Sequence, residues 1–163
     1  MDTTAFFSYL NRRAEADTSV VATLRRSASH DPGTDPRAYP LIERWTAALS
    51  ERDRETVYLA ASCWAIAARR TSGTATTLAQ VLRRIGAAGS NSIEARFTTL
   101  LDADPDELRW RLRQAISLVS STGAAIDWPQ LLDDLLRWNL PSRSVQSKWA
   151  RQFWAPARDE SAA

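Results

Sequence analysis

The sequence predicts an all-α fold, with eight or nine helices arranged in two small helical-bundle subdomains. Apolar residues recur at three- and four-residue spacing from one end of the chain to the other, and no segment shows the alternation of a half-buried strand. Residues that favour helix starts and stops bound most of these stripes. The chain has 163 residues, of which 44% are hydrophobic and 25% charged, as is typical of a globular protein with a buried core.

Five helices are expected in the first half of the chain. The first begins at about residue 4, and the second begins after a cap at Asp17 or Thr18. The other three begin at Pro40, at about residue 52 and at Leu78. A turn-rich break, HDPGTDP at 30–36, separates the second from the third. The helix over about 52–70 is the most apolar, so we expect it to be central and covered on several sides. The last stripe ends at Gly86, which suits a helix C-terminus.

A glycine-rich segment, GAAGSNS at 86–92, is the expected boundary between the two bundles. It divides the chain into an N-terminal helical subdomain over 1–88 and a C-terminal helical subdomain over 89–155. The remaining residues, 156–163, are expected to form a disordered tail.

The second half carries the clearest helix caps. Asp104, Pro105 and Glu107 have the spacing of the N-cap, first and third positions of a helix. DWPQ at 127–130 repeats this arrangement before a Leu-rich helix. A final helix is expected to begin at Ser142 and to bury Val145, Trp149 and Phe153.

No residue pattern typical of an enzyme active site or a metal centre occurs. His30 is the only histidine and Cys63 the only cysteine, too few for a usual zinc site. Asp133 and Asp134 are adjacent on a helix, so their side chains diverge and do not resemble a two-metal centre. Phosphate-binding loops, nucleophile elbows and HExxH motifs are absent. We therefore expect a protein that is not an enzyme and that uses no cofactor or metal.

Nothing in the sequence indicates a membrane or secreted protein. No apolar run approaches the roughly 18 residues of a membrane span, and the N-terminus lacks the basic and apolar regions of a signal peptide. Cys63 has no partner for an internal disulfide and lies in an apolar run, so we expect a core residue in a reducing cytoplasm.

The positive charge consists almost entirely of arginine. Lys148 is the only lysine among 21 basic residues, and the net charge is +2. Arginine binds phosphate in a bidentate manner and stacks on bases, although a GC-rich coding sequence produces the same bias. Acidic residues gather in 31–55 and 102–107, whereas 135–158 contains basic residues and no acid. A two-sided surface with a basic, phosphate-binding face is therefore expected.

Several basic residues lie off the apolar stripes of their helices. For each of them a solvated face is the simpler interpretation, and a nucleic-acid contact is the functional one. These candidates are Arg25, Arg26, Arg83, Arg84, Arg143, Lys148 and Arg151.

The segment DELRWRLRQA at 106–115 places Trp110 on the face opposite its core stripe. A ring of this size is seldom left in water. We expect Trp110 to be covered by another helix of this chain, by a second copy or by a partner, and we treat it as an interface candidate.

Longer stretches resemble one known family. SIEARFTTLLDADPDELRWRLRQAISLV at 92–119 and IDWPQLLDDLLRW at 126–138 are similar to the small subunit of the type I-E Cascade complex, the CasB family. ATLRRSAS at 22–29 and AYPLIERW at 38–45 agree more loosely. The resemblance covers roughly residues 5 to 155.

The resemblance implies an all-α protein with two helical subdomains and no active site. It implies two copies arranged head to tail in a guide-RNA surveillance complex, next to the backbone and large subunits. Its implied ligands are the guide CRISPR RNA and the target and non-target DNA, with base pairing supplying the sequence recognition.

The resemblance also assigns nucleic-acid contacts by position. It implies such contacts for Arg25 and Arg26 in LRR, Arg96 in EARF, Arg143 after the DWP helix, and either Arg52 or Arg54. Some family members have a basic residue near position 105, where this chain has proline. That contact is absent here or is supplied by Arg109 or Arg111.

Two other function classes remain open at this point. A helical transcription regulator would read duplex DNA through a recognition helix, yet no convincing helix-turn-helix is visible and the basic residues are spread over several helices. A protein-interaction adaptor would bind no nucleic acid in a salt-dependent way. Sequence preference and salt dependence separate these classes from a sequence-independent strand binder.

Overall fold

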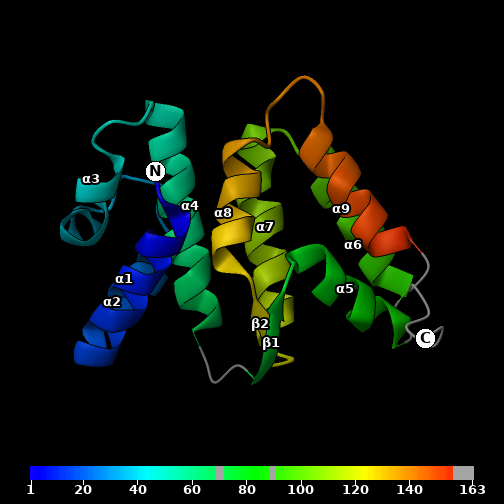
Figure 1. Cartoon of the computed structure of the whole chain (residues 1–163), viewed down its shortest axis with the longest axis horizontal. Helices are drawn as coiled ribbons and strands as arrows, with labels where there is room; N and C mark the ends of the chain where they lie inside the picture. The colour runs from blue at the N-terminus through cyan, green and yellow to red at the C-terminus, as the bar shows by residue number, and fades with distance from the viewer. Residues whose placement is uncertain (69–71, 89–90, 156–163) are drawn as a thin grey trace.

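The computed structural model describes residues 1–68, 72–88 and 91–155, and within these ranges it confirms the predicted all-α class (Figure 1). The described residues form nine α-helices, one 3₁₀ helix and a two-stranded sheet. In chain order the elements are α1 (Thr3–Ala16), α2 (Ser19–Ser27), η1 (Pro36–Ala38), α3 (Tyr39–Thr46), α4 (Glu51–Ala67), β1 (Ser72–Thr76), α5 (Leu78–Ala87), α6 (Asn91–Asp102), α7 (Pro105–Ser120), β2 (Ala124–Ile126), α8 (Trp128–Leu136) and α9 (Ser144–Trp154).

The predicted aspartate caps start helices as expected. The Asp104 carboxylate accepts hydrogen bonds from the backbone N–H groups of Asp106 and Glu107, both at 2.9 Å, at the start of α7. Asp127 accepts from Gln130 N at 3.0 Å at the start of α8. These bonds satisfy N–H groups that have no partner within the helix, and the sequence alone predicted them.

Two helix ends differ from the prediction by one or two residues. α5 continues past Gly86 to Ala87. α9 begins at Ser144 rather than Ser142, because Arg143 adopts a left-handed backbone conformation with φ 49° and interrupts the helix there. Single residues in this conformation are uncommon, so the backbone before α9 turns at Arg143.

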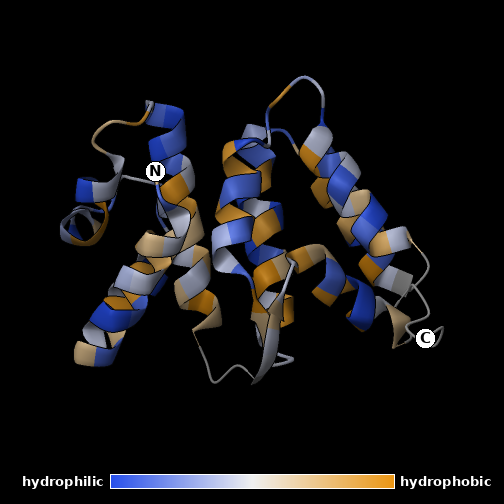
Figure 2. Ribbon diagram, in the orientation of Figure 1, coloured by the Kyte–Doolittle hydropathy of each residue, from blue (hydrophilic) through white to orange (hydrophobic). Residues whose placement is uncertain are grey.

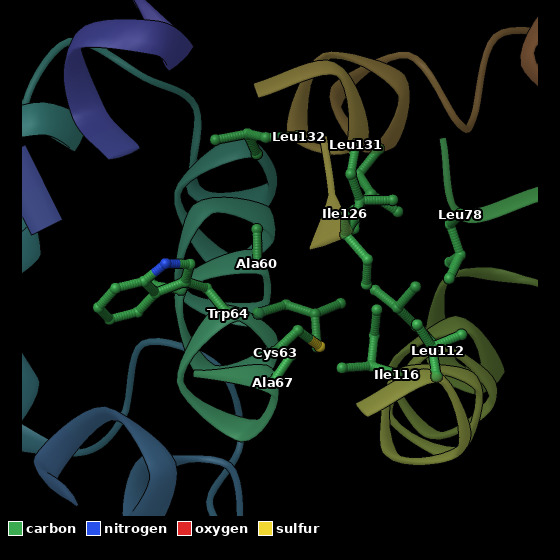
Figure 3. Packing of buried hydrophobic residues seen from close by; sticks show 14 of the residues in the cluster. Ala60, Cys63, Trp64, Ala67, Leu78, Leu112, Ile116, Ile126, Leu131 and Leu132 are labelled. Atoms are coloured by element: carbon green, nitrogen blue, oxygen red, sulfur yellow. The ribbon is translucent and has the colours of Figure 1, made fainter. Parts of the chain in front are cut away.

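Helix α4 is the centre of the molecule, as its apolar sequence predicts. It packs against α2 and α3 on one side and against α7 and α8 on the other. Figure 3 shows Cys63 pointing towards Ile116 of α7 while Trp64 points the opposite way, towards the N-terminal helices. Cys63 is fully buried, and burial raises the pKa of its thiol to about 12, which makes it an unreactive core residue.

Helices α5, α6 and α9 form an outer layer on the C-terminal side, whereas α1 packs against α2 and α8. α5 packs against α6 and α9, and α6 also packs against α7. Most helices carry both hydrophobic and hydrophilic residues along their length (Figure 2), and most of the large apolar side chains are buried. The predicted subdomain boundary between residues 88 and 89 falls at residues 89–90, which lie outside the described residues. The predicted tail over 156–163 also lies outside them. The division into two subdomains stays a prediction.

A short parallel sheet joins two distant segments and was not expected from the sequence. β1 pairs with β2, with Ser72 opposite Ala124 and Thr76 opposite Ile126. Both strands are short and rich in small residues, so they lack the alternation that predicts a strand. In the described part of the chain, no helix is long and apolar enough to cross a membrane.

Candidate nucleic-acid interface

The arginine pair at the end of α2 is exposed, as predicted. Arg25 donates from Nε to the carbonyl oxygen of Ala65, at 3.1 Å, which fixes its guanidinium beside the end of α4. Arg26 forms no ion pair with any described residue. Cations also suit the negative end of the α2 dipole. Both guanidinium groups therefore retain N–H donors for a phosphate.

Arg52 and Arg54 lie two residues apart on α4 but have different surroundings. Arg52 is exposed and its side chain has no partner among the described residues. The Arg54 side chain is only 19% exposed and forms ion pairs with Glu43 and Glu51. It also donates to Gly33 O at 3.3 Å. Of the two arginines that the resemblance offers as alternatives, only Arg52 keeps its N–H donors available for a ligand.

The Arg54 cluster also contains two tyrosines. Its guanidinium carbon lies 5.0 Å from the ring centre of Tyr58 and 5.7 Å from that of Tyr39. Hydrogen bonds from Arg54 and from the Tyr58 hydroxyl hold the pKa of Glu43 below its usual value. The hydrogen bond with Glu43 raises the pKa of Arg54. This cluster stabilises the fold between α3 and α4, and its arginine is fully engaged.

A second basic area lies on α5 and the helix packed against it. Arg83, which is half-buried, and the exposed Arg84 line a shallow depression of about 320 Å³ together with Gln80 and Ala87. Arg84 donates from Nη2 to Thr76 Oγ1 at 3.3 Å. Arg151 is exposed on α9, which packs against α5. None of these three arginines forms an ion pair with a described residue.

Lys148 is bound to another residue of the fold rather than facing solvent freely. Its ammonium group forms an ion pair with Asp134, whose side chain is 3% exposed. The same carboxylate accepts from Trp149 Nε1 at 2.7 Å and from Gln130 Nε2 at 3.0 Å. A buried carboxylate needs such partners, so the main role of Lys148 is to neutralise Asp134.

Arg143 and Arg96 lie on the α6 side of the molecule. Arg143 donates from Nη2 to Leu101 O at 2.7 Å, and the same nitrogen lies 3.8 Å from Asp102 Oδ1. Arg143 thus ties the start of α9 to the end of α6. Arg96 is exposed, forms no ion pair with a described residue, and lines a groove between α6 and α7.

Trp110 is 59% exposed, so no described helix of this chain covers it. The intrachain alternative is therefore wrong for the described residues, and a second copy or a partner remains. The guanidinium carbons of Arg113 and Arg109 lie 5.7 Å and 6.0 Å from its ring centre. A cation at this distance is attracted to the ring face.

The two arginines beside Trp110 bind the turn-rich break between α2 and η1. Arg109 forms an ion pair with Asp31, and Arg113 donates from Nη2 to His30 O at 3.3 Å. Burial lowers the pKa of Arg113. Arg111 faces another direction and approaches Glu107 at 3.9 Å. Arg109 and Arg113 therefore hold the loop before η1, and Arg111 lines a groove between α6 and α7.

The structure thus sorts the predicted basic residues into groups. The first group is exposed in the N-terminal half and consists of Arg25, Arg26 and Arg52. The second lies on the α5–α6–α9 layer and consists of the exposed Arg84, Arg96 and Arg151 and the partly exposed Arg83. The third binds other residues of the fold and consists of Arg54, Lys148 and, in part, Arg143. The sequence missed the α6–α7 groove, because its walls come from three helices. Among the described residues no group of three or more potential metal ligands occurs.

Comparisons with known proteins agree with this fold and with the family resemblance. Residues 20–154 match the family model for CRISPR-associated protein Cse2. A curated Cse2 from Thermus thermophilus is 40% identical over 159 residues, which cover 95% of this chain and 91% of that protein.

Solved structures of related proteins have the same fold. A Cse2-family crystal structure from Thermus thermophilus has a TM-score of 0.84 at 40% identity, over 94% of this chain and 98% of that one. CasB from M. ruber has a TM-score of 0.76 at 30% identity, over 94% and 93%. A chain of a CRISPR RNA-guided surveillance complex, at 18% identity and a TM-score of 0.74 over 93% and 89%, shows the shared fold alone. The chain belongs to the CRISPR-associated Cse2 family, also called CasB.

Proposed function

We propose that this protein is a non-catalytic small subunit of an RNA-guided CRISPR surveillance complex, Cascade, in the cytoplasm. In this role it binds the displaced non-target single-stranded DNA and supports the heteroduplex of guide RNA and target DNA. Its arginine faces grip the backbone phosphates, while base pairing between guide and target recognises the sequence. Membership of the Cse2 family supports the assignment to such a complex.

One observation carries the nucleic-acid part of this proposal. Arginines on α2, α4, α5, α6 and α9 are exposed at least in part and form no ion pair with any described carboxylate: Arg25, Arg26, Arg52, Arg83, Arg84, Arg96 and Arg151. Arginines that no ion pair neutralises attract phosphates through sequence-independent charge. Their spread over several helices suits a strand that runs along the surface, as a displaced single strand does.

The partners in this proposal follow the family resemblance. They are the guide RNA, the target and non-target DNA, the backbone and large subunits, and a second copy placed head to tail. Two weak sites on aligned copies act together through their high effective concentration. The affinity of one free copy is therefore expected to be lower than that of two copies in the complex.

A sequence-specific transcription regulator is the second candidate. It requires a recognition helix whose N-terminal side chains enter the major groove, usually in a dimer with two half-sites. The unpaired arginines instead belong to five different helices. A pure adaptor, the third class, gives no reason for several exposed arginines that form no ion pair with a described residue.

The test is binding of the purified protein to two labelled single-stranded DNAs of unrelated sequence, measured across a salt series. A variant carrying Arg25→Ala, Arg26→Ala and Arg143→Ala is measured beside the wild type, and a circular-dichroism melt checks that it is folded. Because Arg143 also joins α6 to α9, an Arg25→Ala, Arg26→Ala variant serves as the control for folding effects.

Equal affinity for both sequences that weakens with salt, with a flatter dependence in the variants, supports the proposal. A strong preference for one duplex sequence favours the regulator. No salt-dependent binding by the free protein or by the assembled complex leaves the adaptor interpretation.

A further inference from the structure

A carboxylate on the loop between α2 and η1 neutralises an arginine of α7. Asp31 forms an ion pair with Nη1 of Arg109, and the Asp31 side chain is 71% exposed. Arg113, one turn later on α7, donates to the carbonyl oxygen of His30 at 3.3 Å. Burial lowers the pKa of Arg113, and the charge of Asp31 opposes that shift. The Asp31 carboxylate therefore acts on two guanidinium groups while its outer side stays open to solvent.

The loop does not depend on this ion pair for its shape. The backbone carbonyl of Asp31 accepts hydrogen bonds from the N–H group and the hydroxyl of Thr34, at 3.1 Å and 2.8 Å. The bond from Arg113 to the His30 carbonyl also holds the loop against α7. None of these contacts uses the Asp31 side chain, and an exposed ion pair adds little to stability. The main effect of the carboxylate is therefore on the charge of Arg109.

Arg109 borders the surface that we assign to nucleic acid. It lines a depression of about 100 Å³ between the starts of α4 and α7, together with Arg52, the exposed arginine of α4. Glu55 and Asp106 line the same depression, but in the described part of the chain neither forms an ion pair with Arg52 or Arg109. Asp31 is thus the acid that directly competes with a ligand for Arg109.

We infer that Asp31 is an internal competitor of nucleic acid, whose carboxylate occupies Arg109 in the free protein until a backbone phosphate of a strand bound at Arg52 displaces it. Carboxylates and phosphates accept the same paired hydrogen bonds from arginine, so the exchange keeps the donors of Arg109 satisfied. This inference rests on the proposed function, which supplies the strand.

A competitor of this kind weakens binding by the free protein more than binding within the complex. In the complex the strand is already held by other contacts, which raise the effective concentration of its phosphates next to Arg109. The free protein has no such help, because its arginine areas lie on separate helices. Asp31 therefore favours strand binding in the assembled state over binding by the isolated subunit.

Substitutions of single acids separate the release of Arg109 from a general change of charge. Asp31→Asn removes the competing charge and keeps the backbone bonds with Thr34. Asp106→Asn and Glu55→Gln are the matched controls, since each removes one negative charge from the same depression without breaking the ion pair. Each of the three is made in the wild type and in an Arg109→Gln background.

The experiment measures the affinity of the free protein for a labelled single-stranded DNA at low salt, with thermal melts as the check on folding. Asp31→Asn is expected to bind about two- to fivefold more tightly, the range that corresponds to removing an exposed ion pair. In the Arg109→Gln background the same substitution should give a smaller gain, so the two changes are not additive. The effects of Asp106→Asn and Glu55→Gln should be equal in both backgrounds.

Three results overturn the inference. An unchanged or weaker affinity in Asp31→Asn means that the carboxylate does not compete with the strand. An equal gain with and without Arg109 means that only the overall charge matters. A lower melting temperature in both Asp31→Asn and Asp31→Ser means that the ion pair holds the loop. If neither the free protein nor the assembled complex binds DNA in a salt-dependent way, the proposed function fails, whereas salt-dependent binding that ignores Asp31 contradicts this inference alone.

Discussion

At the scale of single residues, the surroundings of an arginine decide whether it serves the fold or a ligand. Arg52 and Arg54 lie half a turn apart on α4, yet only Arg54 is enclosed by carboxylates and tyrosine rings. We expect Arg54→Ala to lower the free energy of unfolding by about 1–3 kcal/mol, because it leaves Glu43 and Gly33 O without their partner. Urea unfolding measures this change.

Arg52→Ala is the matched control for that prediction. Its side chain is exposed and has no partner among the described residues, so its stability should stay within about 0.5 kcal/mol of wild type. The effects on single-stranded DNA affinity should be the reverse, with Arg52→Ala weakening it more. Equal destabilisation by both substitutions would contradict this assignment.

Gly33 depends on the same arginine. Its φ of +81° lies in the left-handed region, and a Cβ there would come within 2.7 Å of Arg54 Nη1. Gly33→Ala therefore combines backbone strain with displacement of the guanidinium, and we expect it to destabilise the protein by about 1–3 kcal/mol. The double variant Gly33→Ala, Arg54→Ala should lose less stability than the two single variants lose in sum, because the clash with the guanidinium is gone. Strictly additive losses would show that the contact between Gly33 and Arg54 is unimportant.

The Glu43 carboxyl gives the fold a predictable acid sensitivity. Its pKa is lowered in the folded state by Arg54 and then by Tyr58. A lowered folded pKa adds stability that is complete above the unfolded value of about 4.3 and is lost as the pH falls through the folded value. Unfolding measured between about pH 6 and 3 should therefore show a smaller loss of stability in Glu43→Gln than in wild type.

The sequence was least informative about the partners of individual side chains. The family resemblance named either Arg52 or Arg54, and Lys148 was a candidate on the basic last helix, but Glu43 and Asp134, the partners of Arg54 and Lys148, come from other helices. Such pairings depend on how helices pack, which a periodic pattern does not contain. The exposure of Arg25 and Arg26 was predictable because both lie off the apolar stripe of their own helix, whereas the hydrogen bond from Arg25 to Ala65 of α4 was not.

At the scale of elements, one buried carboxylate joins the last two helices. Asp134 of α8 binds Lys148 and Trp149 of α9. Removing one partner leaves a buried charge poorly compensated. Since Lys148 is partly exposed, we expect Lys148→Ala to cost about 1–3 kcal/mol, below the range for a fully buried pair. Arg151→Ala, on the exposed face of the same helix, should cost less than about 0.5 kcal/mol.

Amide hydrogen exchange locates the effect of this substitution. Loss of protection in α9 and the adjoining end of α8 is expected in Lys148→Ala, with α1 to α4 unchanged. If protection falls evenly over the whole chain, the ion pair does not hold α9 in particular.

Most helix positions were predictable, because caps and apolar stripes are local signals. Asp104 and Asp127 marked the starts of α7 and α8 correctly. The start of α9 was misplaced because the left-handed conformation of Arg143 is not typical of arginine. The β1–β2 sheet escaped prediction because its stability comes from pairing between segments about fifty residues apart, not from either sequence alone.

At the scale of the whole molecule, the sequence identified the fold class and the central α4, but not how the surfaces are divided. The α6–α7 groove forms only after α5, α6 and α7 have packed. The basic residues likewise form separate areas on the N-terminal half and on the α5–α6–α9 layer.

Salt dependence can show how many of these arginines touch the strand. Affinity for single-stranded nucleic acid falls as the salt concentration rises. Each phosphate contact makes the plot of log affinity against log salt concentration steeper by about 0.7. If Arg25 and Arg26 each bind one phosphate, the double alanine variant should have a slope smaller by about 1.4. The same reduction is expected for Arg83→Ala, Arg84→Ala if the strand also crosses α5. Arg54→Ala, whose guanidinium is bound within the fold, should leave the slope unchanged. An affinity loss in the double variants without a change of slope would mean that these arginines act on folding and not on phosphates.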